Sequence, residues 1–247
     1  MATYSDQGIV LRTHKLGEAD RIITLLTRDH GKVRAVAKGV RRTSSRFGAR
    51  LEPFSQLDLL LVSGRNLDIV SQAVSRRLFG QHLINNYSSF TAAEAMVETA
   101  DRLVAQEHEP SRRHYLLLVG ALNALVAGTA DGPRPPTVIL DSYLLRALAV
   151  SGYAPVLDSC AACGRATEPG FFSPQAGGLV CAHCRPPGAA AVGPVTLVYL
   201  TALLTGRWPD TRDIHPTVRR EASTLVAAFA NWHLEQRLRS LSHVVRD

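Results

Sequence analysis

Four cysteines constrain the fold of this 247-residue chain more than any other feature of its sequence. Cys160 and Cys163 form one pair, Cys181 and Cys184 form a second, and seventeen residues separate the pairs. Two intervening residues let a tight turn direct both thiolates of a pair at one ion, and the longer span suffices for a hairpin that completes a tetrahedron. Because four thiolates close the coordination shell, we predict that these cysteines bind one structural Zn²⁺ ion.

Two disulfides or a pair of redox-active sites are the alternatives to zinc. The N-terminus lacks the basic and apolar regions of an export signal, so we expect a cytoplasmic protein, and stable disulfides are rare there. A thioredoxin-like site needs a βαβ pattern beside one Cys pair, and that pattern is missing. His183 lies inside the second pair, but we expect it to be exposed and not to bind the metal. Gly164 follows the first pair, where a knuckle turn needs a positive φ.

The positive charge of the chain is concentrated in its first third. Residues 1–80 contain fourteen basic and seven acidic side chains, whereas residues 81–247 contain fourteen of each. The whole net charge of +7 therefore belongs to residues 1–80. Such asymmetry indicates a module that binds a polyanion, joined to a neutral one, although a merely soluble basic face is the simpler alternative.

The segment 37–50, "AKGVRRTSSRFGAR", carries five cations and no acidic residue. Phosphate is the partner that best offsets such a concentration of like charge, because guanidinium groups match phosphate oxygens and neutralisation releases counterions. Aromatic residues are sparse in residues 1–80, so we expect phosphate contacts to dominate, with weak sequence preference and strong salt dependence. Lys32 and Arg34 lie just upstream on a predicted strand. The predicted DNA-binding residues are Lys32, Arg34, Lys38, Arg41, Arg42, Arg46 and Arg50.

The first eighty residues have the pattern of short β-strands. Stretches rich in Ile, Val, Leu and Thr, separated by turns containing Gly or Asn, occupy residues 8–16, 20–28, 32–39, 54–62 and 67–75. Five short strands with one long connection favour a small closed barrel such as the OB-fold. A five-stranded SH3-like barrel fits the pattern almost as well.

Helical periodicity begins after Phe79. Apolar residues recur at three- and four-residue steps in residues 88–106, 111–128, 137–152, 195–206 and 217–241. We therefore predict an α+β protein with a five-stranded OB-fold barrel in residues 1–80 and an α-helical bundle domain in residues 81–247. The four-cysteine zinc module, about residues 157–188, is inserted into the helical domain.

The sequence gives little reason to expect catalysis or membrane insertion. A zinc ion closed by four thiolates has no open position for water, and the acidic residues of the first eighty are scattered rather than paired. No phosphate-binding loop or nucleophile elbow is present. The longest nearly apolar run, residues 115–128, is too short to span a bilayer. We expect a non-enzymatic protein without a membrane partner; a nuclease is the alternative.

Residues 8–54 closely resemble the N-terminal domain of the RecO family of bacterial DNA repair proteins. The shared pattern comprises the acidic turn at Glu18 and Asp20, the run "TLLTRDHGK" (24–32), "AKGVRR" (37–42) and "LEPF" (51–54). The order that follows, helices, a four-cysteine element and further helices, also fits the family. The resemblance implies an OB-fold, a helical domain and a zinc module set into that domain.

The resemblance also implies a function, that of a recombination mediator in DNA repair. Such a protein binds single- and double-stranded DNA, anneals complementary strands and acts in the cytoplasm at the nucleoid. With its partner RecR it helps RecA to load on DNA covered by single-strand-binding protein, whose C-terminal tail is a further partner. The DNA-contacting positions carried over are Lys38, Arg41, Arg42, Arg46 and Arg50. An RNA-binding or translation-associated protein with the same barrel and zinc element is the alternative.

Overall fold

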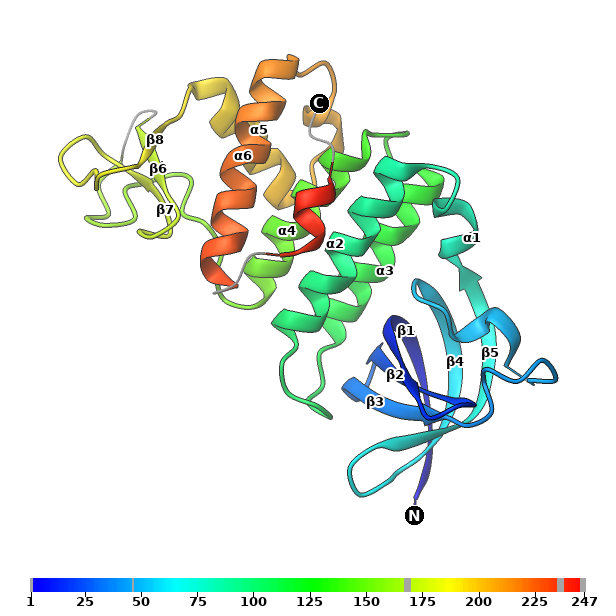
Figure 1. The fold of residues 1–247 in the computed structure, drawn as a ribbon. Coiled ribbons are helices and arrows are strands. Elements are labelled where there is room, and N and C mark those ends of the chain that lie inside the picture. Colours follow the sequence, from blue (N-terminus) through cyan, green and yellow to red (C-terminus); the bar gives the residue numbers. More distant parts are fainter. Residues whose placement is uncertain (1, 46, 167–169, 235–237, 245–247) are drawn as a thin grey trace. The chain divides into compact units, whose positions relative to one another are not determined.

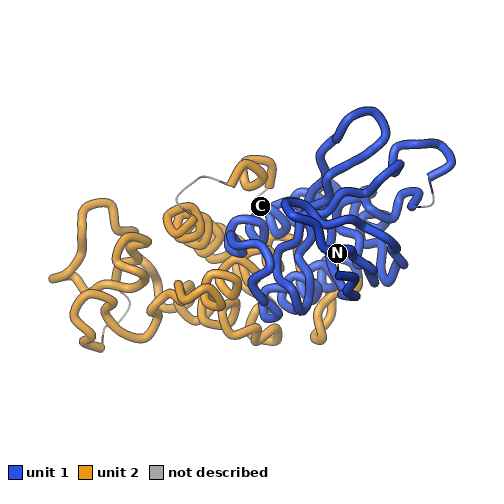
Figure 2. The backbone as a smooth tube through the Cα atoms, turned by 90° about the horizontal axis from the view of Figure 1, so that it is seen from below, with its two compact units in different colours: residues 1–126 blue, residues 127–247 orange. Residues whose placement is uncertain are grey.

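A computed structural model describes residues 2–45, 47–166, 170–234 and 238–244 (Figure 1). The chain divides into two compact units, residues 1–126 and residues 127–247 (Figure 2). The first unit contains the predicted barrel and the first two long helices, and the second contains the remaining helices and the cysteines. The domain boundary that we place near residue 80 from the sequence stays a prediction.

Five strands form a closed barrel at the start of the chain: β1 (Thr3–Leu16), β2 (Asp20–Thr27), β3 (Gly31–Ala37), β4 (Ser55–Val62) and β5 (Asp68–Leu78) (Figure 1). The strand order is β1-β2-β3-β5-β4, and β1 closes the barrel by pairing with β4 as well as β2. All pairings are antiparallel except the short parallel contact of β3 with β5. This strand order is that of the OB-fold. The structure therefore has the OB-fold and not the SH3-like barrel, the other fold that the sequence allows.

Alternating side chains of the strands fill the barrel, as the period of two requires. The connection between β3 and β4 also contributes to this core, through Val40, Phe47 and Leu51. The relative solvent exposure is 2% for Phe47 and 1% for Leu51, which lies in the short helix η1 (Gly48–Leu51). The connection that carries the basic segment is thus fastened to the barrel at both of its ends. The core comprises Val10, Ile23, Leu25, Val33, Ala35, Ala37, Val40, Phe47, Leu51, Leu57, Leu59, Leu61, Val70 and Ala73.

Three helices follow the barrel in the first unit: α1 (Phe79–Leu83), α2 (Tyr87–Leu103) and α3 (Arg112–Ala127). Asn86 caps α2, since its side chain accepts a hydrogen bond from the backbone N–H of Ser89 at 2.9 Å. The apolar stripe predicted for this helix is buried at Ala93, Met96 and Ala100. The C-terminal end of α2 leads back to the barrel, where residues 107 and 108 contact β3.

The second unit contains the helices α4 (Pro136–Val150), α5 (Pro194–Thr205) and α6 (Pro216–His233), which pack on one another. Short 3-10 turns, η2 (Trp208–Thr211) and η3 (Ser240–His243), follow α5 and α6. Each of the three helices has a proline at its first position, where the missing N–H has no helical acceptor to lose. The sequence pattern therefore predicts all five long helices, with boundaries within a few residues, except that α6 ends well before residue 241.

A small sheet separates α4 from α5 in the sequence. It consists of β7 (Gly178–Val180), β6 (Phe171–Ser173) and β8 (Ala190–Ala191), in that spatial order. β6 and β7 form the hairpin that the spacing between the cysteine pairs predicts. None of the helices in the described ranges is both long and apolar enough to cross a membrane.

Candidate metal centre and basic surface

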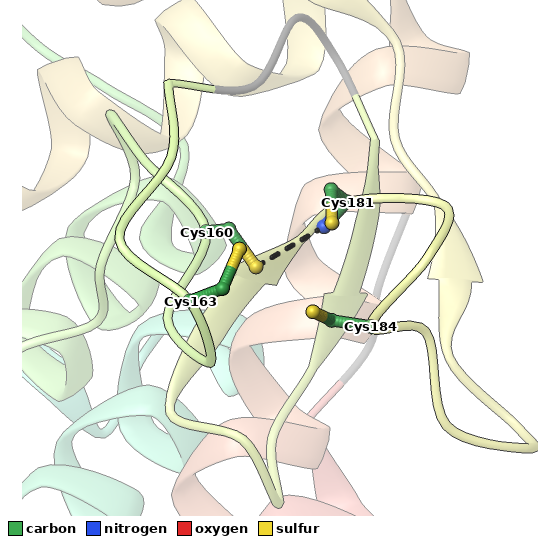
Figure 3. Close-up of side chains that lie close together, drawn as sticks. All are labelled: Cys160, Cys163, Cys181 and Cys184. Atoms are coloured by element: carbon green, nitrogen blue, oxygen red, sulfur yellow. Dashed lines mark hydrogen bonds between the residues drawn. The ribbon is translucent and has the colours of Figure 1, made fainter.

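The hairpin of β6 and β7 brings the two cysteine pairs together. The four Sγ atoms of Cys160, Cys163, Cys181 and Cys184 all lie within 4.8 Å of one another, and no disulfide joins them (Figure 3). Cys160 is buried and Cys163 is exposed, so the cluster lies at the surface of the second unit with one side covered. Tetrahedral zinc–thiolate sites have this donor set and require such proximity.

Each pair sits in a knuckle whose backbone closes on itself. The N–H of Gly164 donates to the carbonyl of Cys160 at 2.8 Å, and the N–H of Cys184 donates to that of Cys181 at 3.1 Å. Gly164 has a φ of +70°, the conformation that the sequence predicts for this position. These turns direct both thiols of each pair to the same side, which explains why the spacing of two residues suits a metal site.

Hydrogen-bond donors also face the sulfur atoms. The N–H of Cys181 donates to Sγ of Cys160 at 3.4 Å (Figure 3), and Nε of Arg165 donates to Sγ of Cys163 at 3.5 Å. The first contact lowers the pKa of Cys160 to about 6, and the Arg165 guanidinium lowers the pKa of Cys163. Hydrogen bonding to neighbouring thiols, that of Cys181 above all, instead raises the pKa of Cys184. Four thiolates at this separation need a cation between them, so the site fits a metal ion.

The basic segment, residues 37–50, is held on the barrel by backbone contacts at Gly39 and Arg41, and Lys38, Arg41 and Arg42 lie at the surface. The N–H of Gly39 donates to the Asp20 carboxylate at 2.7 Å, and the N–H of Arg41 donates to the carbonyl of Ala19 at 2.9 Å. The Arg41 guanidinium lies over the β1–β2 turn and donates to the carbonyls of Gly17 and Glu18, at 3.2 and 2.9 Å. These contacts order residues 38–42 beside the turn.

The structure places most of the predicted DNA-binding residues of this segment at the surface. Lys38, Arg41, Arg42 and Arg50 are exposed. Lys38 and Arg42 have no carboxylate partner among the described residues, whereas Arg41 uses only carbonyl oxygens. Arg46 lies outside the described residues. Phe47, which follows Arg46, is buried and is therefore no platform for a base.

Lys32 and Arg34, the other two predicted DNA-binding residues, have different surroundings. The Lys32 ammonium lies 2.9 Å from the carboxylate of Asp101 and donates to its backbone carbonyl at 2.6 Å. The Lys32 side chain is 11% exposed. Nε of Arg34 lies 2.5 Å from the Glu107 carboxylate. Both acids come from the C-terminal end of α2 and the loop after it, so these two cations are shared with the helical part of the first unit.

Lys15 is a basic residue near the basic segment that the search for runs of charged residues did not find. Lys15 is exposed near the end of β1, and its Cα pairs with that of Arg21 across the β1–β2 ladder. Arg21 in turn contacts Glu52 at 2.6 Å. The pairing of β1 with β2 could have identified Lys15, because this residue lies two positions before Gly17, in the turn that the Arg41 guanidinium contacts.

Comparisons with known proteins identify the family. The family model described as "Recombination protein O N terminal" matches residues 1–79, and the one described as "Recombination protein O C terminal" matches residues 84–242. The chain is 56% identical over 241 residues to the "DNA repair protein RecO" of Cutibacterium acnes, covering 98% of both chains. It is 54% identical over 246 residues to the protein of that name from Nocardioides sp., covering 98% of this chain and 99% of the other. It is 51% identical over 250 residues to that of Streptomyces coelicolor, covering 99% of each.

The two family models, which match residues 1–79 and 84–242, place the chain in the class of DNA recombination and repair proteins. The chain belongs to the RecO family of DNA repair proteins. Its role therefore lies in DNA repair and recombination, which confirms the resemblance seen in residues 8–54.

Proposed function

We propose that the chain is a non-enzymatic recombination mediator that binds single- and double-stranded DNA through the basic segment and anneals complementary strands. The exposure of Lys38, Arg41 and Arg42 on an ordered part of the barrel carries this proposal. Annealing makes and breaks no covalent bond. It requires a cationic surface that reduces the repulsion between two polyanionic strands while base pairing supplies the specificity.

The order of the basic segment supports this role. Val40, Phe47 and Leu51 anchor it in the barrel core, and the Asp20 carboxylate holds its backbone at Gly39. A segment that is already ordered loses less conformational entropy when it binds a strand than a free loop does. Lys38 and Arg42 have no carboxylate partner among the described residues, and Arg41 contacts only carbonyl oxygens, so phosphate oxygens are the strongest acceptors available to these three side chains.

The four cysteines bind a single Zn²⁺ ion in this proposal, and the ion is structural. Zinc would join the two knuckles of a module whose described residues form a sheet of three short strands, so the binding energy of the metal becomes folding energy. The partners that the family implies, RecR, RecA and the C-terminal tail of single-strand-binding protein, are partners of this chain in the same proposal. We place its action in the cytoplasm, at the nucleoid.

The experiment is an annealing assay with complementary fluorescent DNA strands, naked or precoated with single-strand-binding protein, with and without the partner RecR. We expect the protein to accelerate annealing of both substrates and RecR to alter the reaction on coated strands. Matched RNA strands test the alternative. Acceleration confined to RNA would replace this proposal by an RNA-binding function, and cleavage of either strand in Mg²⁺ would show an enzyme.

A further inference from the structure

The outer face of β1, β2 and β3 carries a row of cations that lie next to the basic segment but outside it in the sequence. Val33, Ala35 and Ala37 point into the barrel, so the alternate residues of β3, among them Lys32 and Arg34, point outward. Strand register places Arg12 and Arg34 on either side of Thr24, across the three strands. Strands 2 and 3 of OB-folds form the face that usually binds oligonucleotides.

An acidic part of the same unit covers this face. The Asp101 carboxylate lies 2.8 Å from Nε of Arg12 and 2.9 Å from the Lys32 ammonium, and Glu107 lies 2.5 Å from Nε of Arg34. The backbone after α2 lies along β3, where the N–H of His108 donates to the carbonyl of Lys32 at 2.9 Å. Carboxylates therefore contact the cations of this face, so the phosphates of a strand bound here would compete with them.

The two acids differ in how firmly they are held. The Asp101 side chain is 17% exposed and contacts two cations, Arg12 and Lys32. The Lys32 ammonium also donates to the backbone carbonyl of Asp101. Glu107 is 31% exposed and meets an Arg34 side chain that is 43% exposed. Ion pairs with this much exposure contribute little to stability and exchange readily, whereas removing a partner from a buried pair costs far more. Arg34 is thus available to another anion, while Lys32 is not.

We propose that Glu107 is an internal competitor of phosphate for Arg34, one of the predicted DNA-binding residues, because its carboxylate contacts the Arg34 guanidinium in the free chain. The inference rests on the proposed DNA binding, because Arg34 extends the surface of the basic segment. Lys38 follows directly after β3, and four residues of strand place it about 13 Å from Arg34. A strand bound at residues 38–42 reaches Arg34 by displacing the Glu107 carboxylate, which then returns to solvent.

The test measures the affinity of the full chain for oligothymidylate at several salt concentrations. Glu107→Gln removes the competing charge, so we expect an affinity increase of up to about fivefold at low salt. One added phosphate contact steepens the slope of log affinity against log salt by about 0.7. Adding Arg34→Gln to this variant should abolish both changes, whereas Arg34→Gln alone has a smaller effect.

Glu109→Gln is the matched control, because Glu109 is an exposed acid of the same loop and the substitution changes the net charge equally. We expect it to leave the salt slope unchanged. Equal gains for Glu107→Gln and Glu109→Gln would reduce the effect to overall charge and overturn the inference. An unchanged slope for Glu107→Gln in a normally folded protein would overturn it as well. In either case the wild-type chain still binds DNA, so the proposed function stands. If the proposed function is wrong, neither the wild type nor any variant shows salt-dependent DNA binding.

Discussion

The ammonium of Lys32 and the carboxylate of Asp101, sixty-nine residues apart in the sequence, lie 2.9 Å from each other and join β3 to the end of α2. The Lys32 side chain is 11% exposed and that of Asp101 is 17% exposed, so water screens this pair little. The pair makes Lys32 part of the structure of the first unit, while its predicted role in DNA binding stays a prediction.

Lys32→Met should lower the free energy of unfolding by about 2 kcal/mol, because it leaves Asp101 partly buried with one cation fewer. DNA affinity should stay within about twofold of wild type. Urea denaturation and oligothymidylate binding measure the two effects. Lys15→Met, which changes an exposed lysine of the same barrel, is the stability control and should shift the free energy by no more than about 0.5 kcal/mol. A stable Lys32→Met protein with weak DNA binding would return Lys32 to the binding surface.

Gly31 tests the contact between β3 and the loop after α2. Its φ is +65°, and a Cβ built there would lie 1.7 Å from the carbonyl oxygen of Glu109. Gly31→Ala therefore combines an unfavourable backbone conformation with a backbone clash, and we expect at least about 2 kcal/mol of destabilisation. Gly17→Ala is matched in φ, at +57°, but has no atom within 4 Å, so only about 1 kcal/mol is expected. Thermal denaturation measures both variants. Equal losses of stability in Gly31→Ala and Gly17→Ala would show that the backbone of Glu109 does not lie close to Gly31.

Removing one cysteine tests the metal centre. Cys181→Ser should lose bound zinc and several kcal/mol of stability in the second unit, because binding energy is folding energy in such modules. Elemental analysis of protein expressed in zinc-containing medium measures the metal content, and we expect one zinc ion per chain for the wild type. Ser159→Ala, beside the first ligand, is the control and should retain zinc. Full zinc content in Cys181→Ser would exclude the four-thiolate site.

Burial of His114 predicts a pH dependence of stability. Burial lowers the pKa of this side chain below its ordinary value of 6.5, so the unfolded chain binds the proton more tightly than the folded one. The contribution to stability is therefore present above pH 6.5 and is lost as the pH falls below it. His233 in the second unit acts in the same direction. In His114→Gln, the free energy of unfolding measured by urea denaturation should decrease less between pH 7.5 and pH 5.5 than in the wild type. An equal decrease in both proteins would show that His114 is not the cause.

Local patterns in the sequence predict most of the fold. Period-two strands, period-3.6 helices and the knuckle at Cys160 and Cys163 depend on residues close to one another in the chain, so their structure can be read there. The alternatives of OB-fold and SH3-like barrel depend on which strands pair at closure, and only the β1–β4 register decides that.

The candidate site is less accessible from sequence where it depends on distant residues. Lys32 and Arg34 are equivalent to Lys38 by charge, yet Asp101 and Glu107 reach them across some seventy residues. The local sequence likewise does not show that Phe47 is buried, because its burial follows from the return of the segment to the barrel. Pairings of this kind depend on tertiary packing, which no local pattern encodes.

The salt dependence of oligothymidylate binding measures whether exposed cations of the basic segment contact DNA phosphates. About four phosphate contacts give wild type a slope of log affinity against log salt near −3. Replacing Arg41 and Arg42 by Gln should remove two contacts, weaken binding at low salt and bring the slope to about −1.5. A wild-type slope near zero, or one that the double substitution leaves unchanged, would show that these cations do not bind phosphates.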